Sequence, residues 1–172
     1  MRQNKKTKVL EVFYEYPNGS FSIRDISKLT RVPRATVHKI LKELKKENLI
    51  TKENKVKDSL IFKTKKINYF IEMIITSGLI EEIINQLNPS CIILFGSFRK
   101  GEDVSASDID ISVEKDEFKE NRIVSFRELG EFEKQIGRKI QIHEFNRSLI
   151  DTGLFNNIAN GIILIGFLEV KK

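Results

Sequence analysis

The chain has 172 residues, of which 40% are hydrophobic and 31% are charged, and its formal net charge is +6. This is the composition of a globular protein, and the length allows one large domain or two small ones. No apolar run approaches the roughly 18 residues that span a bilayer. No apolar signal segment follows residues 1–6, so we expect a cytoplasmic protein with no membrane contact.

The charge is divided unevenly along the chain. Residues 1–66 contain 18 Lys and Arg against 7 Asp and Glu, whereas residues 67–172 contain 12 against 17. The net charges of these two parts are therefore +11 and −5. Such a split predicts two units with different partners, of which the first is suited to a polyanion.

Three helices and a hairpin are predicted in the basic part. A first helix covers residues 6–16 and is broken by a Pro-Asn-Gly turn. Ser22 as N-cap and Asp25 as its capping-box partner start a second helix. A third helix follows Pro33, since apolar residues recur there with helical spacing. Two short strands, 49–51 and 59–62, are expected around a basic loop.

This order of elements is that of a winged helix-turn-helix. Residues 32–44 resemble the recognition helix of MarR-like and ArsR-like regulators. The resemblance implies that this unit binds double-stranded DNA, usually as a homodimer on two half-sites. Residues off the apolar stripe are expected to face the major groove, and lysines of the loop are expected to contact phosphates. These residues are Arg34, Thr36, His38, Lys39, Lys42, Lys52, Lys55 and Lys57. The alternative is that the charges only solvate the helix faces and that the unit contacts proteins.

Residues 67–87 have apolar residues at helical spacing, interrupted at Gly78. The pattern predicts one broken helix or two shorter ones, which would couple the two units and could also serve a dimer. The predicted domains are therefore residues 1–66, a connecting helix over residues 67–87, and a second domain over residues 88–172.

The most informative motif lies in the acidic part. A predicted strand over residues 91–95 ends in Gly96-Ser97, and ten residues later Asp108 and Asp110 lie in a second predicted strand over residues 108–113. Glycine at such a strand end lets the backbone approach a phosphate closely. Two aspartates at positions i and i+2 share one face of a strand and can hold a divalent cation. The spacing predicts a site for a metal-bound nucleoside triphosphate.

Gly-Ser, ten residues and Asp-x-Asp resemble the signature of the minimal nucleotidyltransferases of the DNA polymerase β superfamily. The resemblance implies a small α/β domain with a mixed sheet. It also implies transfer of a nucleoside monophosphate from an NTP, with ATP as the favoured nucleotide and Mg²⁺ or Mn²⁺ as the metal. It implies catalytic and metal-binding roles for Asp108 and Asp110. It also implies nucleotide contacts for Gly96, Ser97, Arg99, Lys100 and Ser107.

Further elements complete this domain in the prediction. A helix is expected over residues 122–136, a strand over residues 139–145, a last helix over residues 147–159 and a closing strand over residues 162–165. Cys91 is the single cysteine, which excludes an intramolecular disulfide, and we interpret it as a small buried residue.

Members of the resembled family usually supply a third carboxylate from a later strand, and the matching position here is the neutral Gln141. By strand alternation His143 shares the face of Gln141, and Glu144 lies on the opposite face unless a bulge turns it inward. His143 is either a replacement base or a structural residue. Glu114 shares the face of Asp110 but lies roughly 13 Å along the strand.

These predictions favour one function and leave two alternatives. We expect a DNA-binding transcriptional regulator with a nucleotidyltransferase-like domain that binds Mg-NTP and could transfer NMP to a protein or RNA acceptor. The alternatives are an active nucleotidyltransferase of a toxin–antitoxin pair with a HEPN-like partner, or an inactive domain that senses a nucleotide or holds a partner. Without a third carboxylate, catalysis itself is left open.

Overall fold

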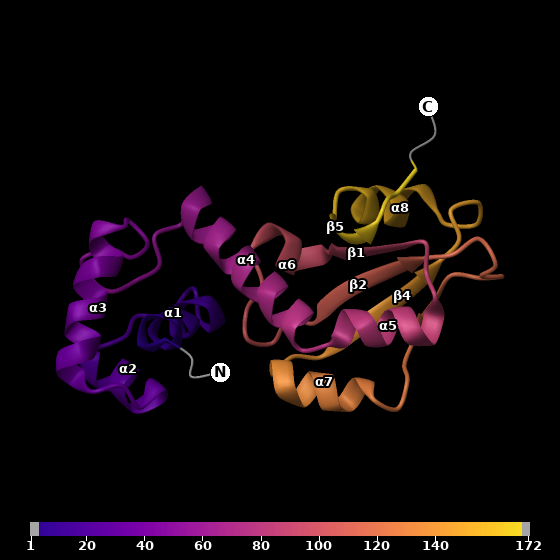
Figure 1. The fold of residues 1–172 in the computed structure, drawn as a ribbon. Helices are drawn as coiled ribbons and strands as arrows, with labels where there is room; N and C mark the ends of the chain where they lie inside the picture. Colours follow the sequence, from indigo (N-terminus) through magenta and orange to yellow (C-terminus); the bar gives the residue numbers. More distant parts are fainter. Residues whose placement is uncertain (1–3, 170–172) are drawn as a thin grey trace. The chain divides into compact units, whose positions relative to one another are not determined.

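The computed structural model describes residues 4–169, which form two compact units that divide between Lys66 and Ile67 (Figure 1). The first unit contains three short helices, and the second contains a five-stranded sheet with helices around it. The predicted two-domain class, helix-turn-helix followed by an α/β domain with a mixed sheet, is confirmed. None of the helices in residues 4–169 is both long enough and apolar enough to cross a membrane.

The first unit consists of α1 (Lys5–Glu15), α2 (Ile23–Thr30) and α3 (Arg34–Lys46). The predicted capping box is present: Ser22 Oγ accepts the Asp25 N–H at 3.2 Å, and Asp25 Oδ2 accepts the Ser22 N–H at 3.1 Å. The Ser22 hydroxyl also donates to Asp25 Oδ2 at 2.6 Å, and this bond, followed by the one from the Ser22 N–H, lowers the pKa of Asp25. Arg31 adopts a left-handed conformation with a φ of 57°, which turns the chain from α2 toward α3.

The apolar stripe of α3 forms the centre of this unit. Its four buried residues pack with residues of α1, α2 and the segment after α3, which are almost completely buried. The buried set is Val9, Phe13, Ile26, Val37, Ile40, Leu41, Leu44 and Leu49. The charged side chains of α3 are thereby left on its outer face.

The predicted wing is only partly right. A single bridge joins Ile50 to Val56, and Asn54 turns the chain between them with a φ of 56°. The expected strand over residues 59–62 is wrong, because α4 (Leu60–Thr76) starts there. Phe62, Phe70 and Ile74 are buried at helical spacing, and that pattern outweighs the local strand preference of a short apolar run.

The segment predicted as a broken helix or two helices contains two. α4 ends at Thr76 and α5 (Leu79–Leu87) begins after Gly78, whose φ of 85° only glycine adopts easily. The boundary between the two compact units falls inside α4.

The sheet has the order β3-β4-β2-β1-β5. β1 (Cys91–Phe95) lies between β2 (Ile109–Glu114) and β5 (Ile162–Gly166) and is antiparallel to both. β2 is parallel to β4 (Ile140–Phe145), and β3 (Arg122–Val124) is antiparallel to β4 at the edge. The sheet is therefore mixed, as predicted.

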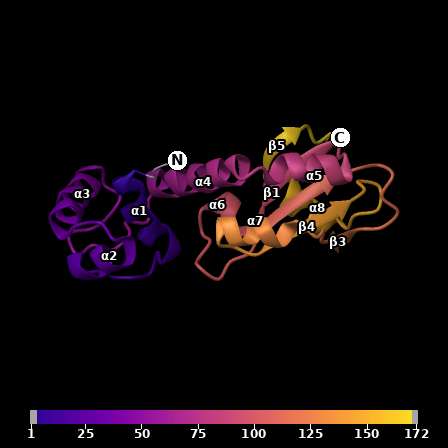
Figure 2. The ribbon, with the colours of Figure 1, turned by 60° about the horizontal axis from the view of Figure 1, so that its bottom comes forward.

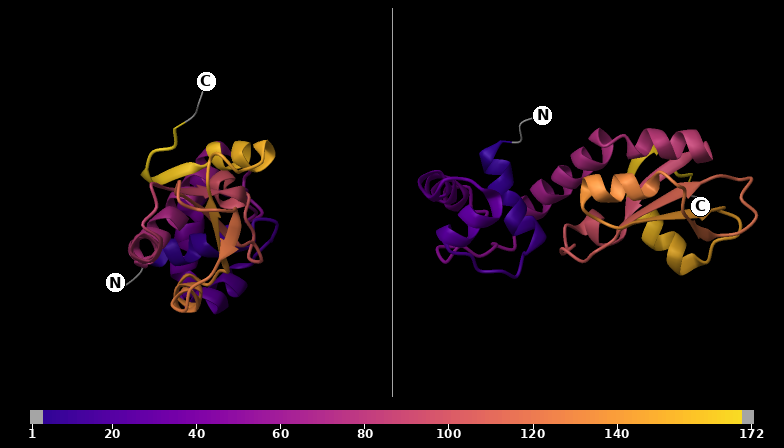
Figure 3. Two further views of the ribbon diagram at one scale, coloured as in Figure 1. Left: turned by 90° about the vertical axis from the view of Figure 1, so that its right-hand side faces the viewer. Right: turned by 90° about the horizontal axis from the view of Figure 1, so that it is seen from below.

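Helices cover both faces of this sheet, as two views show (Figures 2 and 3). α8 (Thr152–Ala159) lies on one face, where Ile158 joins a buried cluster with Cys91, Ile93, Phe95 and Phe145. α5 lies on the opposite face (Figure 3, left). The short helix α6 (Gly96–Lys100) follows β1 directly, and α7 (Leu129–Ile136) precedes β4. β1 and β2 are thus held between two layers of helices.

Two predicted helices differ from the structure. Residues 122–124 form the edge strand β3 rather than the start of a helix, and Arg122 there pairs with Glu144 of β4. The last helix begins at Thr152 instead of residue 147, because Asp151 Oδ1 caps it by accepting two backbone N–H groups at 2.9 and 3.0 Å.

Candidate functional site

The two halves of the Gly-Ser and Asp-x-Asp motif meet at one end of β1 and β2. Phe95 is the register partner of Asp110, so Gly96 lies beside the Asp110 side chain. A Cβ on Gly96 would overlap Asp110 Oδ2 and lie 3.1 Å from Asp110 Cγ. Gly96 also has a φ of 69°. This close approach and this backbone conformation both require glycine.

Asp108 lies just before β2, on the side of the neighbouring strand β4. In the parallel register of β2 and β4, Gln141 is the partner of Asp110. The Gln141 Nε2 amide donates a hydrogen bond to Asp108 Oδ2 at 2.6 Å. Gln141 therefore lies where the sequence places it, against the aspartates, but it presents a hydrogen-bond donor instead of a charge.

His143 is the next residue of β4 on this face. Its Nε2 atom lies 3.8 Å from Asp110 Oδ1, and its ring meets the Phe95 ring edge to face at 5.1 Å. Nε2 is buried and has no hydrogen-bond partner among the described residues. His143 therefore lies beside Asp110, and it is further along β4 from Asp108 than Gln141 is.

Neither of the two other glutamates replaces the missing carboxylate. The register of β2 and β4 runs without a bulge, so Glu144 stays on the opposite face and pairs with Arg122 Nε at 2.7 Å. Glu114 is at the far end of β2 and is held by Arg147 Nε at 2.7 Å. Cys91 is buried nearby, as expected, and burial raises the pKa of its thiol to about 11.

Residues 77–166 of the chain match the family described as polymerase beta, nucleotidyltransferase. This match covers just over half of the chain and includes both halves of the motif. The chain belongs to the polymerase beta nucleotidyltransferase family.

A second match identifies the first unit of this nucleotidyltransferase-family protein. Residues 6–54 match the IclR helix-turn-helix domain. The unit is therefore a helix-turn-helix DNA-binding domain, but of the IclR kind, and the predicted resemblance to MarR and ArsR regulators is wrong. No curated protein matches the chain.

The other predicted nucleotide contacts lie on α6 and on the loop before β2. Ser97 opens α6, while Arg99 and Lys100 form its last turn. Neither cation makes an ion pair with Asp108 or Asp110 in the part of the chain that the structure describes. The Ser107 hydroxyl accepts the Val104 N–H at 2.9 Å and so closes the loop that carries Asp108.

The residues present fit one divalent cation better than two. Asp108 and Asp110 supply hard carboxylate oxygens, and the phosphates of a nucleotide would supply the remaining ligands that Mg²⁺ or Mn²⁺ requires. A bound cation would neutralise the charge of the triphosphate. No group of three or more His, Cys, Asp or Glu side chains in residues 4–169 is arranged to hold a metal ion. The resemblance implies a third carboxylate as a ligand for a second cation, and Gln141 does not supply that charge.

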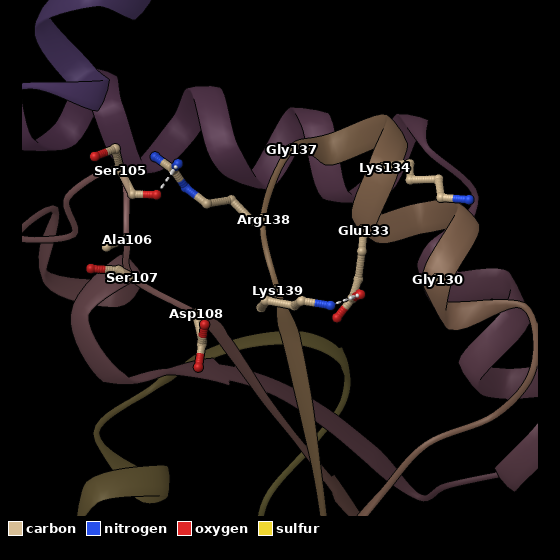
Figure 4. A pocket seen from close by; sticks show the side chains of 10 residues that line it. All are labelled: Ser105, Ala106, Ser107, Asp108, Gly130, Glu133, Lys134, Gly137, Arg138 and Lys139. Carbon is tan, nitrogen blue, oxygen red and sulfur yellow. Dashed lines mark hydrogen bonds and ion pairs between the residues drawn. The ribbon is translucent and has the colours of Figure 1, made fainter.

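An open groove of about 550 Å³ begins at Asp108 and was not foreseen from the sequence (Figure 4). One wall is the loop over residues 105–108, and the other consists of α7 residues and residues 137–139. Arg138 Nη1 donates to the Ser105 carbonyl at 2.7 Å, and Lys139 Nζ pairs with Glu133 Oε2 at 2.7 Å. The basic pair after Gly137 is visible in the sequence, but only the parallel register of β2 and β4 brings it beside Asp108.

The predicted DNA-contacting residues are accessible on the first unit. Arg34, His38, Lys39 and Lys42 are exposed on the outer face of α3, whereas Thr36 is half-buried at its border. Lys52, Lys55 and Lys57 are exposed around the turn after α3. Lys57 Nζ donates to Asn48 Oδ1 at 3.2 Å, which ties this turn to the end of α3.

Proposed function

We propose that the chain is a DNA-binding transcriptional regulator whose second unit binds a metal–NTP complex, with ATP as the nucleotide, and transfers its NMP group. The approach of Asp110 to Gly96 is the observation that carries this proposal. It places a carboxylate pair for a cation next to a backbone that a phosphate can approach. We also propose that the protein acts in the cytoplasm.

In this proposal Asp108 and Asp110 hold Mg²⁺ or Mn²⁺, while Gly96 and Ser97 face the phosphates. Arg99, Lys100 and Ser107 lie on the neighbouring segments and are assigned to the nucleotide on the strength of the family motif. Residues 1–66 bind DNA, residues 67–87 connect the units, and residues 88–172 bind the nucleotide.

A second candidate function is nucleotide sensing without transfer. The hydrogen bond from Gln141 to Asp108 favours it, since Gln141 removes the negative charge that a second cation and the activation of an acceptor hydroxyl need. The family resemblance also leaves open a toxin–antitoxin pair with a HEPN-like partner, and a homodimer on DNA. These two remain predictions.

Calorimetry with ATP in the presence and absence of Mg²⁺ tests the nucleotide site. We expect saturable binding that needs Mg²⁺ and that falls at least about tenfold, or about 1.4 kcal/mol, in Asp108→Asn/Asp110→Asn. Glu117→Gln changes an exposed carboxylate in the same unit and should bind as the wild type does. Equal ATP binding by the double variant and the wild type would refute the proposed nucleotide site.

A further inference from the structure

The two edges of the sheet differ in length and in charge. β3, at one edge, has three residues, and its Arg122 pairs with Glu144 and has Nη1 4.0 Å from Glu120 Oε1. β5, at the other edge, has five residues and contains neither a charge nor a proline (Figure 2). Natural edge strands are commonly kept short or charged, which prevents them from pairing with a strand of another chain. β3 is protected in this way, whereas β5 is not.

Exposed apolar side chains gather at the β5 edge. Ile163 and Ile165 are 48% and 42% exposed, and Phe167, directly after the strand, is 74% exposed. The register against β1 shifts once, so that Ile165 pairs with Ile92 and Ile163 pairs with the adjacent Ile93. Adjacent residues of a strand point to opposite faces of a sheet. The two exposed isoleucines therefore lie on opposite faces, and a strand added at this edge would cover apolar groups on both.

The segment that contains β5 has no charge over its whole length. Residues 152–168 include no Asp, Glu, Lys, Arg or His, although at the chain's average of 31% about five of these 17 residues would be charged. The exposed polar side chains of α8 and its C-cap in this segment are Thr152, Asn156, Asn157 and Asn160. Amide side chains both donate and accept hydrogen bonds, so an identical surface can pair with them.

These features fit a second copy of the chain better than a charged partner. A two-fold axis places the β5 strands of two copies antiparallel, so each copy offers the other the same backbone groups and the same apolar side chains. Neither copy has a charge at this edge that contact would repel or remove from water. Among residues 4–169, β1 is the only strand that pairs with β5, so the outer side of β5 is open to another strand.

We propose that the β5 edge is a homodimer interface, at which the β5 strands of two copies pair antiparallel and join their sheets into one. The proposal goes beyond the proposed function, because it depends neither on nucleotide binding nor on transfer. It assigns the contact between copies to β5, whereas the sequence pattern suggests the helices over residues 67–87 for that role.

The mass of the full chain in solution tests this interface, measured by sedimentation equilibrium without DNA or nucleotide. We expect the wild type to form a dimer. Ile163→Lys/Ile165→Lys should raise the dissociation constant of that dimer at least about a hundredfold, because pairing would bury two ammonium groups from each copy. Ile123→Lys/Leu149→Lys is the matched control, since it adds the same charges at two exposed positions of the same unit outside β5, and it should dimerise as the wild type does. A monomeric wild type, or a dimer that Ile163→Lys/Ile165→Lys leaves unchanged, would overturn the proposal.

Cysteine crosslinking locates the contact without disrupting it. Single cysteines are introduced at each position of residues 162–166, and the dimers that form under mild oxidation are separated without reductant. A strand that pairs antiparallel with its own copy has one centre of symmetry, where the two Cβ atoms come within reach of a disulfide. We expect the yield to peak at one position of β5. The wild type, whose Cys91 is buried, and Ile123→Cys should give no crosslink. No crosslink at any position of β5, or an equal yield from Ile123→Cys, would overturn the proposal.

Discussion

At the scale of single residues, the position of Gly96 depends on the carboxylate of Asp110. Gly96→Ala would place a methyl group on Asp110 Oδ2 and put alanine at a φ of 69°, which costs roughly 1–2 kcal/mol. Because Asp110 must move, we expect Mg-ATP affinity to fall at least about tenfold in calorimetry. Gly130→Ala is the control, since its Cβ meets no atom within 4 Å and its φ is not positive. Unchanged ATP affinity of Gly96→Ala would show that Asp110 is not part of the site.

Gln141 lies at the position where the family resemblance leads us to expect a third carboxylate. Gln141→Glu keeps the size of the side chain but replaces the hydrogen bond to Asp108 with two adjacent carboxylates, which costs about 1–3 kcal/mol without metal. We expect a lower melting temperature without metal, a larger increase on adding Mn²⁺ and binding of a second Mn²⁺ ion. Gln135→Glu adds the same charge at an exposed position of α7. The same Mn²⁺ response from both variants would contradict this account.

The site residues differ in how well the sequence predicts them. The spacing of Gly96, Asp108 and Asp110 is enough to predict that they lie close together. Gly96 follows one strand, the two aspartates lie at the start of the next strand, and the two strands pair. The Gln141–Asp108 hydrogen bond and the position of the half-buried His143 beside Asp110 depend on the parallel register of β2 and β4. That register joins segments about 30 residues apart, and no local pattern encodes it.

At the scale of elements, periodicity predicts helices and strands well where caps mark their ends. The Ser22–Asp25 capping box gives the start of α2, and Gly78 gives the break between α4 and α5. The failures are short apolar segments: residues 59–62 extend a helix, and residues 122–124 pair with β4 as an edge strand. A run of two or three apolar residues fits either a helix or a strand, so tertiary contacts decide between them.

α3 is the element that we expect to contact DNA, through its outer face. Arg34→Ala and Lys39→Ala should each weaken binding to a duplex of mixed sequence. Each lost phosphate contact should reduce the slope of log affinity against log salt by about 0.9. Fluorescence anisotropy over a range of salt concentrations measures both. Lys119→Ala removes an equal charge from the second unit and should leave the slope unchanged; an equal reduction in all three variants would argue against α3.

At the scale of the whole molecule, the two compact units correspond to the two halves of the charge distribution. The basic unit has a helix-turn-helix of the IclR kind, and the acidic unit has a nucleotidyltransferase fold. In the proposed function, the uneven charge corresponds to two anionic ligands: the basic unit binds DNA directly, and the aspartates of the acidic unit bind a triphosphate through a metal ion.

The most direct test of this account counts the Mn²⁺ ions that the protein binds in the presence of a non-hydrolysable ATP analogue, by electron paramagnetic resonance. We predict one ion for each wild-type chain and none above background for Asp108→Asn/Asp110→Asn. Mn²⁺ binding that is unchanged by the double substitution would contradict the claim that these two aspartates form a one-metal nucleotide site.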